Sequence, residues 1–381
     1  MKPLAGISPP KAGGLRREPL WMRLHVDPWL LLLVLTLASV AGFILYSASS
    51  KDLGMVYRQA AHYAIGLAVM LFVAQLQPRF LQRWLPPAYL VSVLLLLAVL
   101  LVGFEAKGAQ RWLRIPGVIT FQPSEIMKLV MPMSVAWYLG RREMPPRFAH
   151  VCICLLIIFV PVLLILKQPD LGTTLLIAAS GVFGLLLAGL RWRYILGALL
   201  MLAPGAVAMW FFVMHSYQKQ RVLTLLNPEN DPLGAGWNII QSKAAIGSGG
   251  VFGKGWLQGT QSHLDFLPEG HTDFIIAVLA EEFGLVGVAL LLLVYLLIVA
   301  RGLYITHHAQ EAFSKLLAGS VTLTFFVYVF VNIGMVSGLL PVVGVPLPLI
   351  SYGGTSVVTL LAGFGILMSI HTHRKWMGQG G

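Results

Sequence analysis

Acidic and basic side chains that could act as a general base or bind a cation cluster in one short stretch of the sequence. Asp265, Glu269, His271 and Asp273 fall within nine residues, although charged residues make up only 11% of the chain. Directly after Asp273 the sequence becomes apolar, which predicts a long hydrophobic helix. A carboxylate beside such a helix is costly, so Asp273 is a candidate functional residue. The alternative is that Thr272 caps the helix and that Asp273 complements its dipole.

Two further motifs carry charges that could serve chemistry or structure. Glu125 and Lys128 have i, i+3 spacing, which places both on the same face of a helix. An ion pair that fixes helix packing explains them at least as well as direct chemistry does. Asp170, in the segment KQPDLGT, either caps a helix or lines a cavity, and we favour the structural role.

The composition places these residues in a membrane protein. Hydrophobic residues make up 57% of the chain and its mean hydropathy is +0.79, which is outside the range of soluble domains. Apolar runs of about 17–25 residues predict an all-α polytopic membrane protein with about ten transmembrane helices. The predicted spans are 29–48, 60–76, 86–104, 124–140, 150–167, 172–189, 194–214, 273–299, 314–336 and 355–371. Cys152 and Cys154 point to different faces of one span, so neither a disulfide nor a metal pair is expected.

Lysine and arginine decide the orientation of the spans. They concentrate in the segments that are cytoplasmic if the N-terminus is inside, so both termini are predicted to be cytoplasmic. The net charge of +12 is explained in the same way, and no nucleic acid partner is expected. The predicted organisation is a basic segment over 1–26, a single membrane domain over 27–373 and a cytoplasmic tail over 374–381.

This orientation places the unusual loops together on the outer face. They are 105–123, 167–173, 215–272 and 337–354. The large loop 215–272 joins spans 7 and 8 and predicts a short helix, a turn at Asn227-Pro228, a second helix around Trp237–Ile246 and a glycine-rich run. Loops of this length in compact proteins are usually functional. The proline- and glycine-rich segment 337–354 cannot be an uninterrupted lipid-facing helix.

Cations on the outer face need an explanation in a protein whose positive residues otherwise lie inside. Lys219 and Arg221 lie in the large loop, and Arg111 lies beside Trp112 in the first one. Binding of an anionic substrate, especially a pyrophosphate, would explain these cations. Trp112 has an alternative role as an interfacial anchor. The glycine-rich run 247–255 has neither the spacing nor the strand-to-helix context of an ATP-binding loop.

Several motifs in this order resemble one known family. They are QPSE at 122–125, QPDLGT at 168–173, LPEGHTDF at 267–274, AEEFGLVG at 280–287 and PLPLISYGGTS at 346–356. Together they resemble the SEDS family of shape, elongation, division and sporulation proteins. The segment 227–255 resembles the rod-shape branch rather than the division branch, and the resemblance covers essentially the whole chain after residue 26.

The resemblance implies an activity, a place and partners. SEDS proteins are peptidoglycan glycosyltransferases with ten transmembrane helices. They polymerise lipid II, an undecaprenyl-pyrophosphate-linked disaccharide-pentapeptide, at the outer (periplasmic) face of the bacterial cytoplasmic (inner) membrane. The expected partners are a class B penicillin-binding protein, penicillin-binding protein 2, and other proteins of the elongation complex. The family's essential aspartate corresponds to Asp273, its tryptophan to Trp112, and its glutamate and lysine to Glu125 and Lys128.

The implied reaction converts an α-linked donor into a β-1,4 bond, so it requires inversion by one displacement. Asp273 is the predicted general base, with Glu269 and His271 as supporting residues. The predicted cations for the leaving pyrophosphate are Arg111, Lys128, Lys219 and Arg221. Asp273 and Glu269 would suit a divalent cation, Mg²⁺ or Mn²⁺. No nucleotide or organic cofactor is expected.

Two other functions are compatible with parts of this pattern. A lipid II flippase or other transporter would also have many spans, intramembrane charges and a cavity. The polar motifs lie on one face, however, whereas a transporter needs access from both. A non-catalytic scaffold of the elongation machinery would leave the residues around Asp273 unexplained.

Overall fold

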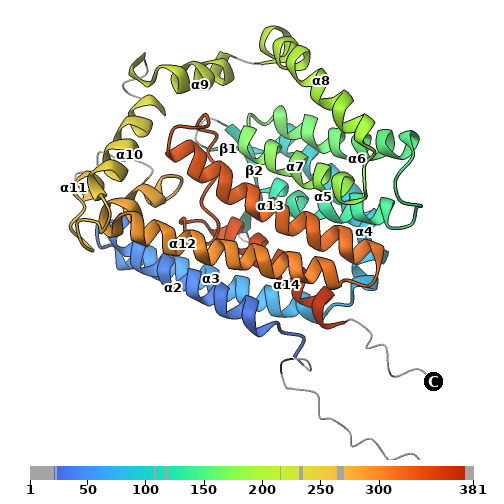
Figure 1. The fold of residues 1–381 in the computed structure, drawn as a ribbon, viewed down its shortest axis with the longest axis horizontal. Helices are drawn as coiled ribbons and strands as arrows, with labels where there is room; N and C mark the ends of the chain where they lie inside the picture. The colour runs from blue at the N-terminus through green and yellow to red at the C-terminus, as the bar shows by residue number, and fades with distance from the viewer. Residues whose placement is uncertain are drawn as a thin grey trace, which may run out of the picture.

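The predicted spans form a bundle of long helices (Figure 1). This computed structural model describes residues 21, 24–106, 109–115, 119–214, 216–230, 235–263 and 270–373. Each predicted span corresponds to a helix, and the helices are α2 (Pro28–Ala48), α3 (Leu53–Gln75), α4 (Pro78–Val102), α5 (Pro123–Leu139), α6 (Phe148–Leu166), α7 (Leu171–Leu187), α8 (Trp192–Ala208) with its π-helical continuation η1 (Met209–Val213), α12 (Ile275–His308), α13 (Ala312–Val336) and α14 (Gly354–Thr372).

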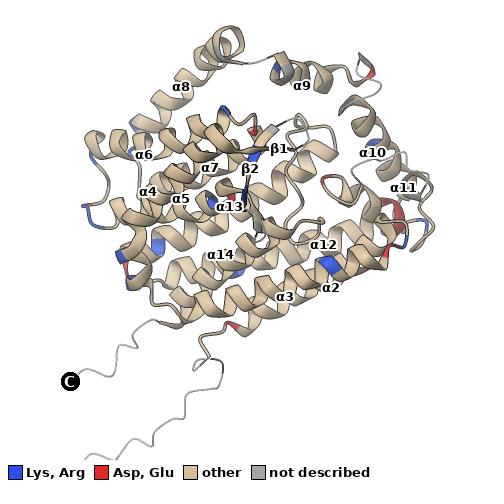
Figure 2. Ribbon diagram, turned by 180° about the vertical axis from the view of Figure 1, so that it is seen from behind, with Lys and Arg blue, Asp and Glu red and all other residues tan. Residues whose placement is uncertain are grey.

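Length and hydropathy confirm a polytopic helical membrane protein. Among the described residues, eight helices are long and apolar enough to cross a membrane. The helices α5 and α7 have 17 residues each and complete the ten predicted spans. Most of the ribbon carries no charge, and Lys, Arg, Asp and Glu lie mainly toward the ends of the helices (Figure 2).

The helices α13 and α14 form the centre of the bundle. In their most apolar windows, 67% and 61% of the residues are buried, compared with 28% in α12. Helix α14 packs along α3, and α13 packs against α12, α7 and α5. Helix α8 has no buried residue and lies at the edge of the bundle (Figure 1). Its sequence is apolar on all sides, as expected of a helix that faces lipid.

The connections include elements that position the site. Three antiparallel strands follow α4, namely β1 (Phe104–Ala106), β2 (Ala109–Ile115) and β3 (Ile119–Phe121), in the order β1-β2-β3. The large loop contains α9 (Ser216–Leu226), the 3-10 helix η2 (Pro228–Asn230), α10 (Ala235–Gly249) and α11 (Thr260–His263). The predicted helix, turn and second helix of this loop are confirmed. The small sheet was not predicted, because its strands are too short to show an alternating pattern.

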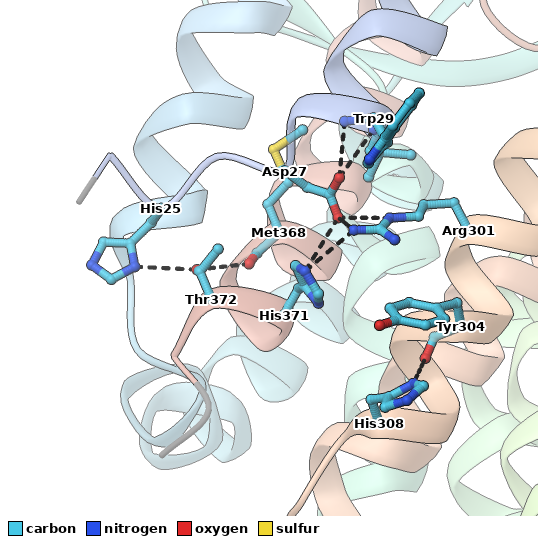
Figure 3. Close-up of polar contacts among 10 residues, drawn as sticks. His25, Asp27, Trp29, Arg301, Tyr304, His308, Met368, His371 and Thr372 are labelled. Atoms are coloured by element: carbon cyan, nitrogen blue, oxygen red, sulfur yellow. Dashed lines mark hydrogen bonds and ion pairs between the residues drawn. The ribbon is translucent and has the colours of Figure 1, made fainter. Parts of the chain in front are cut away.

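The bundle has two chemically different ends. We call the end with the described residues of 103–122, 167–170, 214–274 and 337–353 the loop end, and the opposite end the turn end. At the turn end, Asp27 is fully buried and caps α2 by accepting hydrogen bonds from the main chain of Trp29 and Leu30. Its carboxylate also pairs with Arg301 of α12 at 2.8 Å and lies 3.7 Å from His371 of α14 (Figure 3).

Helix α12 differs from the prediction at both ends. The predicted span was 273–299, whereas the helix starts at Ile275 and continues to His308. Its N-cap is Phe274, which makes no side-chain capping hydrogen bond, so Thr272 is not the cap. Asp273 therefore precedes the helix. The helix is also interrupted at Gly284, whose φ of 64° and ψ of −162° are not helical.

Candidate active site

Asp273 lies just before α12 at the loop end, and neighbouring elements hold its main chain. Asn332 of α13 donates a hydrogen bond from Nδ2 to the Asp273 carbonyl oxygen at 2.8 Å. Ser351 Oγ donates to the Thr272 carbonyl oxygen at 2.5 Å. The next residue, Phe274, is 1% exposed and packs in the core. Tertiary contacts therefore fix the backbone of Asp273.

The loop over residues 337–353 lies against the carboxylate. A Cβ atom at Gly344 would lie 3.5 Å from Oδ2 of Asp273. Tyr352 donates from its main-chain nitrogen to the His271 carbonyl oxygen at 2.9 Å, and the two rings meet edge to face at 6.3 Å. His271 is thus a partner of this loop and part of the frame that holds Asp273.

Hydrogen bonds from two helices hold the same loop in place. Tyr295 of α12 donates to the Pro348 carbonyl oxygen at 2.6 Å. Gln59 of α3 donates to the Ser351 carbonyl oxygen at 3.3 Å. Buried polar side chains in a membrane span usually mark a structural or functional contact. Here they fix a non-helical backbone that lies against protein, as membrane depth requires.

The start of α7 packs directly on this loop. A Cβ atom at Gly172 would lie 2.7 Å from Cγ2 of Val345 and 2.9 Å from the Val343 carbonyl oxygen. The second hydrogen bond from Nδ2 of Asn332 goes to the Val345 carbonyl oxygen at 2.7 Å. The Asn332 amide therefore connects the main chain at Asp273 to the loop, and the start of α7 packs on the same loop.

Asp170 is a helix cap with two further partners. Its Oδ1 accepts a hydrogen bond from the main chain of Thr173 at 3.2 Å, as the N-cap of α7. Its Oδ2 accepts one from Gln122 Nε2 at 3.0 Å and lies 3.7 Å from Arg111 Nη1. Arg111, on β2, also donates from Nε to the Gln168 carbonyl oxygen at 3.3 Å. These contacts bind the small sheet to the α6–α7 turn.

Glu125 and Lys128 form a buried ion pair on α5. Lys128 Nζ lies 2.6 Å from Glu125 Oε1, and the two side chains are only 10% and 9% exposed. The ammonium also lies 5.4 Å from the ring centroid of Tyr328 on α13. Tyr328 precedes Asn332 by one helical turn on α13, so the ion pair lies one layer deeper in the bundle than Asp273. This geometry favours the structural interpretation of the pair.

The remaining predicted site residues are less closely connected. Trp112 lies in β2 opposite Phe104 and is partly buried. Lys219 and Arg221 lie on α9, which packs mainly against η2 and α10 at the rim of the bundle (Figure 1). Their role at the site stays a prediction. Glu269 lies outside the described residues.

Sequence reasoning missed residues that shape the site. Asn332 is fully buried within an apolar helix, and an isolated amide in a membrane span is a signal that could have found it. Glu281 and Glu282 are 0% and 1% exposed on α12. They belong to the motif AEEFGLVG, where two adjacent carboxylates inside a predicted span were the available signal.

The described residues include no group of three or more His, Cys, Asp and Glu side chains that could hold a metal ion. Asp273 itself offers the hard oxygen ligands of its carboxylate. Mg²⁺ is often held by one or two carboxylates together with substrate phosphates and water. A divalent ion shared with a phosphate substrate is therefore chemically compatible with Asp273.

Comparison with known proteins identifies the family. The family profile for FtsW, RodA and SpoVE, described as cell cycle protein, matches residues 22–376. The chain belongs to this FtsW/RodA/SpoVE family. It is 53% identical over 363 residues to the peptidoglycan glycosyltransferase MrdB of Escherichia coli K12, covering 95% of this chain and 98% of that protein. It is 37% identical to the probable peptidoglycan glycosyltransferase FtsW of Trichlorobacter lovleyi, covering 92% and 94%.

Solved structures of the FtsW/RodA/SpoVE family share this architecture. A chain of a peptidoglycan synthase complex, described as coordinating polymerization and crosslinking, matches with a TM-score of 0.81 at 32% identity. That match covers 92% of this chain and 99% of the other. RodA of Thermus thermophilus matches with a TM-score of 0.69 at 30% identity, covering 92% and 98%. The SEDS resemblance drawn from the motifs is confirmed.

Proposed function

We propose that this chain, a peptidoglycan glycosyltransferase of the elongation type, polymerises lipid II into β-1,4-linked glycan strands with Asp273 as the general base. One observation carries the assignment of the base. The Asp273 carboxylate lies beside Gly344, at the point where the α7 start, the 337–353 loop and the α12 start meet. The lack of a side chain at Gly344 leaves room for substrate beside the carboxylate, while Asn332 fixes the main chain.

The proposed step is a single inverting displacement. The 4-hydroxyl oxygen of the acceptor sugar attacks the anomeric carbon of the donor and forms the new C–O bond. The bond from that carbon to the pyrophosphate oxygen breaks, and undecaprenyl pyrophosphate leaves with the electron pair. Asp273 accepts the hydroxyl proton, which makes it the general base. A backbone held by tertiary hydrogen bonds orients the carboxylate before substrate arrives.

The leaving pyrophosphate requires positive charge, and the four predicted cations now divide into two pairs. Lys128 pairs with Glu125, and Arg111 binds the α6–α7 turn, so we assign both to the framework of the site. We assign the pyrophosphate to Lys219 and Arg221, which α9 carries at the loop end. Cations that approach a developing anion stabilise it most in a site from which water is excluded.

A divalent cation, Mg²⁺ or Mn²⁺, is part of the proposal. Asp273 and the substrate phosphates would hold it, and when bound it would neutralise charge on the leaving group. We propose no nucleotide or organic cofactor. Removal of divalent ions with a chelator, followed by return of Mg²⁺ or Mn²⁺, should abolish and restore polymerisation of purified lipid II.

The site and the topology support a location at the outer face of the bacterial cytoplasmic membrane, with both termini in the cytoplasm. The four loop-end segments carry the site residues, and clustered Lys and Arg favour the opposite side as cytoplasmic. A class B penicillin-binding protein, penicillin-binding protein 2, is the proposed transpeptidase partner. The likeness to a chain of a peptidoglycan synthase complex supports this pairing.

The deciding experiment is polymerisation of lipid II by the full-length protein with its partner, comparing wild type with Asp273→Asn. The matched control is Glu143→Gln, because the Glu143 side chain is 92% exposed. We expect Asp273→Asn to lose polymerisation and Glu143→Gln to retain it. Normal polymerisation by Asp273→Asn would reject the base. Transfer of lipid II across a vesicle membrane without polymerisation would favour a flippase, and absence of both activities in the wild-type protein would favour a scaffold.

A further inference from the structure

Helix α12 is broken at Gly284, about three helical turns after Asp273, and the glycine-rich loop fills the break. Leu285 donates from its main-chain nitrogen to the Gly250 carbonyl oxygen at 3.0 Å, and Val286 donates to that of Val251 at 3.1 Å. The break occurs at Gly284, where φ is 64°. Only glycine adopts this region readily. The loop therefore supplies acceptors for helix N–H groups that have lost their usual partners.

The same loop also supplies donors to the helix carbonyls. Lys254 donates from its main-chain nitrogen to the Glu281 carbonyl oxygen at 3.0 Å, and Gly255 donates to that of Glu282 at 3.0 Å. A Cβ atom at Gly253 would lie 2.1 Å from the Glu282 carbonyl oxygen, so only glycine allows this approach. The glycines of the run 247–255 thus serve close docking on α12.

A buried ion pair locks the docked loop. Glu281 is 0% exposed, and its Oε1 accepts from Lys254 Nζ at 2.8 Å. The same oxygen accepts from the main chain of Thr260 at 2.8 Å and of Gln261 at 2.9 Å. Buried carboxylates are stable when paired and hydrogen-bonded in this way, and removal of one partner strands the other charge.

The neighbouring carboxylate, Glu282, connects the docked loop and α12 to α2. Glu282 Oε1 accepts hydrogen bonds from Ser47 Oγ of α2 and from the main chain of Leu257, the latter at 3.2 Å. Trp256 of the loop donates to the Phe43 carbonyl oxygen on α2 at 3.3 Å. Loop, α2 and α12 therefore meet at one junction, and the adjacent Glu281 and Glu282 attach to different parts of it.

This junction contacts the chain on both sides of Asp273. Gln261, on one side, is bound to Glu281, and Glu281 lies about two helical turns after Asp273 on the other side. We propose that Lys254 and Glu281 are positioning residues. Their ion pair holds the docked loop on α12, and the loop and helix in turn position Asp273. The functional part of this proposal rests on the proposed role of Asp273.

The contacts of Lys254 decide between positioning and substrate binding. Its ammonium group lies 2.8 Å from Glu281 and 2.7 Å from Thr260 Oγ1, and its side chain is 26% exposed. An outer-face cation was expected to bind an anionic substrate, whereas this one binds a buried carboxylate. The ion pair gives Lys254 a partner inside the protein. We therefore expect its charge to hold the loop on α12 rather than to bind substrate.

The test compares Lys254→Met with Lys254→Arg in the full-length protein with its partner. Lys254→Met removes the charge at a side chain that is 26% exposed and leaves the Glu281 carboxylate without its cation, and Lys254→Arg retains the pair. We expect Lys254→Met to lower kcat for lipid II polymerisation by about tenfold or more, since small displacements in a site can cost about 10²-fold. KM should stay within about threefold, because substrate contacts are not removed. Lys254→Arg should retain most of the activity, and Glu281→Gln should behave like Lys254→Met.

Hydrogen exchange supplies a readout that does not depend on activity. Lys254→Met should increase exchange in peptides over 250–263 and 270–280, and leave α14 unchanged. Wild-type exchange over 270–280 would overturn the proposal, even if kcat falls. A rise in KM with unchanged kcat would overturn it too, because Lys254 would then bind substrate. If Asp273→Asn polymerises normally, the proposed base fails, but the exchange comparison still decides whether Lys254 and Glu281 position this segment.

Discussion

Asn332 and Asp273 are joined by a hydrogen bond of 2.8 Å from the amide of one to the carbonyl oxygen of the other. The second proton of the same amide reaches the Val345 carbonyl oxygen at 2.7 Å. Asn332 is fully buried, so bulk water does not compete for its amide. One side chain thus sets the distance between the Asp273 backbone and the loop that lies against its carboxylate.

Asn332→Leu should weaken both the site and the fold. The substitution keeps the volume but removes the donor from the buried bond to Val345, at a cost of about 1–3 kcal/mol, and from the part-buried bond to Asp273. We expect a lower melting temperature, measured by thermal unfolding. In lipid II polymerisation, kcat should fall while KM changes less.

Thr324→Val is the control for Asn332→Leu. Thr324 lies on the same helix and donates only to the Ser320 carbonyl oxygen one turn earlier, among the hydrogen bonds found here. Its replacement should change neither the melting temperature nor kcat by much, since the helix backbone remains paired. Equal behaviour of the two variants would show that the bridge from Asn332 does not position Asp273.

Gly344→Ala should reduce activity without unfolding the protein. The residue has a φ of +73°, which costs an alanine about 1–3 kcal/mol, and the new methyl group would lie 3.5 Å from Asp273 Oδ2. We expect kcat for polymerisation to fall while the bundle still folds. Gly197→Ala on α8 is the control, since a Cβ there meets nothing within 4 Å. An active Gly344→Ala protein would mean that substrate does not enter beside this glycine.

The Glu125–Lys128 pair predicts a rescue by exchange. Glu125→Gln or Lys128→Met alone leaves one buried charge without its partner, at a cost of about 3–5 kcal/mol. The double exchange Glu125→Lys with Lys128→Glu restores a pair at the same spacing on α5. We expect it to recover most of the melting temperature and of the polymerisation lost in the single variants. Recovery of stability without activity would instead indicate that Lys128 has its own chemical role beside Tyr328.

The fold was predictable because membrane spans leave a strong signal. Each predicted span matches a helix within a few residues at most ends, since lipid excludes an unpaired backbone and apolar length alone identifies a crossing. The largest error is in α12, predicted to end at residue 299 and found to continue to His308. Its last turns carry Arg301 and two histidines and extend beyond the apolar run, so hydropathy could not identify them.

The site was only partly predictable, because its geometry depends on long-range contacts. Residue type and spacing made Asp170 and the Glu125–Lys128 pair candidates, and the family resemblance singled out Asp273, whose role stays a prediction. Nothing in the sequence indicated that Asn332 would bind the Asp273 main chain, since a hydrogen bond between α13 and the start of α12 requires the tertiary structure. The sequence made Arg111 a candidate cation for the substrate and gave no sign that the guanidinium would bind carbonyl oxygens of the α6–α7 turn.

The ion pair of Asp27 and Arg301 at the turn end should control stability and leave catalysis unchanged. Asp27 is fully buried, caps α2 and pairs with Arg301 at 2.8 Å, so it joins α2 to α12 far from Asp273 (Figure 3). Arg301→Met strands the buried carboxylate and should lower the free energy of unfolding by about 3–5 kcal/mol. Arg79→Gln breaks the Arg79–Glu311 pair at the same end, whose side chains are 67% and 44% exposed, and should cost about 0–1 kcal/mol.

Thermal unfolding and lipid II polymerisation by the folded fraction distinguish these effects. Arg301→Met should unfold at a clearly lower temperature, while its kcat and KM per folded molecule match those of the wild type. Arg79→Gln should match the wild type in both measurements. If kcat falls in Arg301→Met at temperatures where the protein is fully folded, the two ends of α12 are coupled across the break at Gly284. The docked loop would then transmit strain from the turn end, because its main chain contacts α12 on both sides of that break.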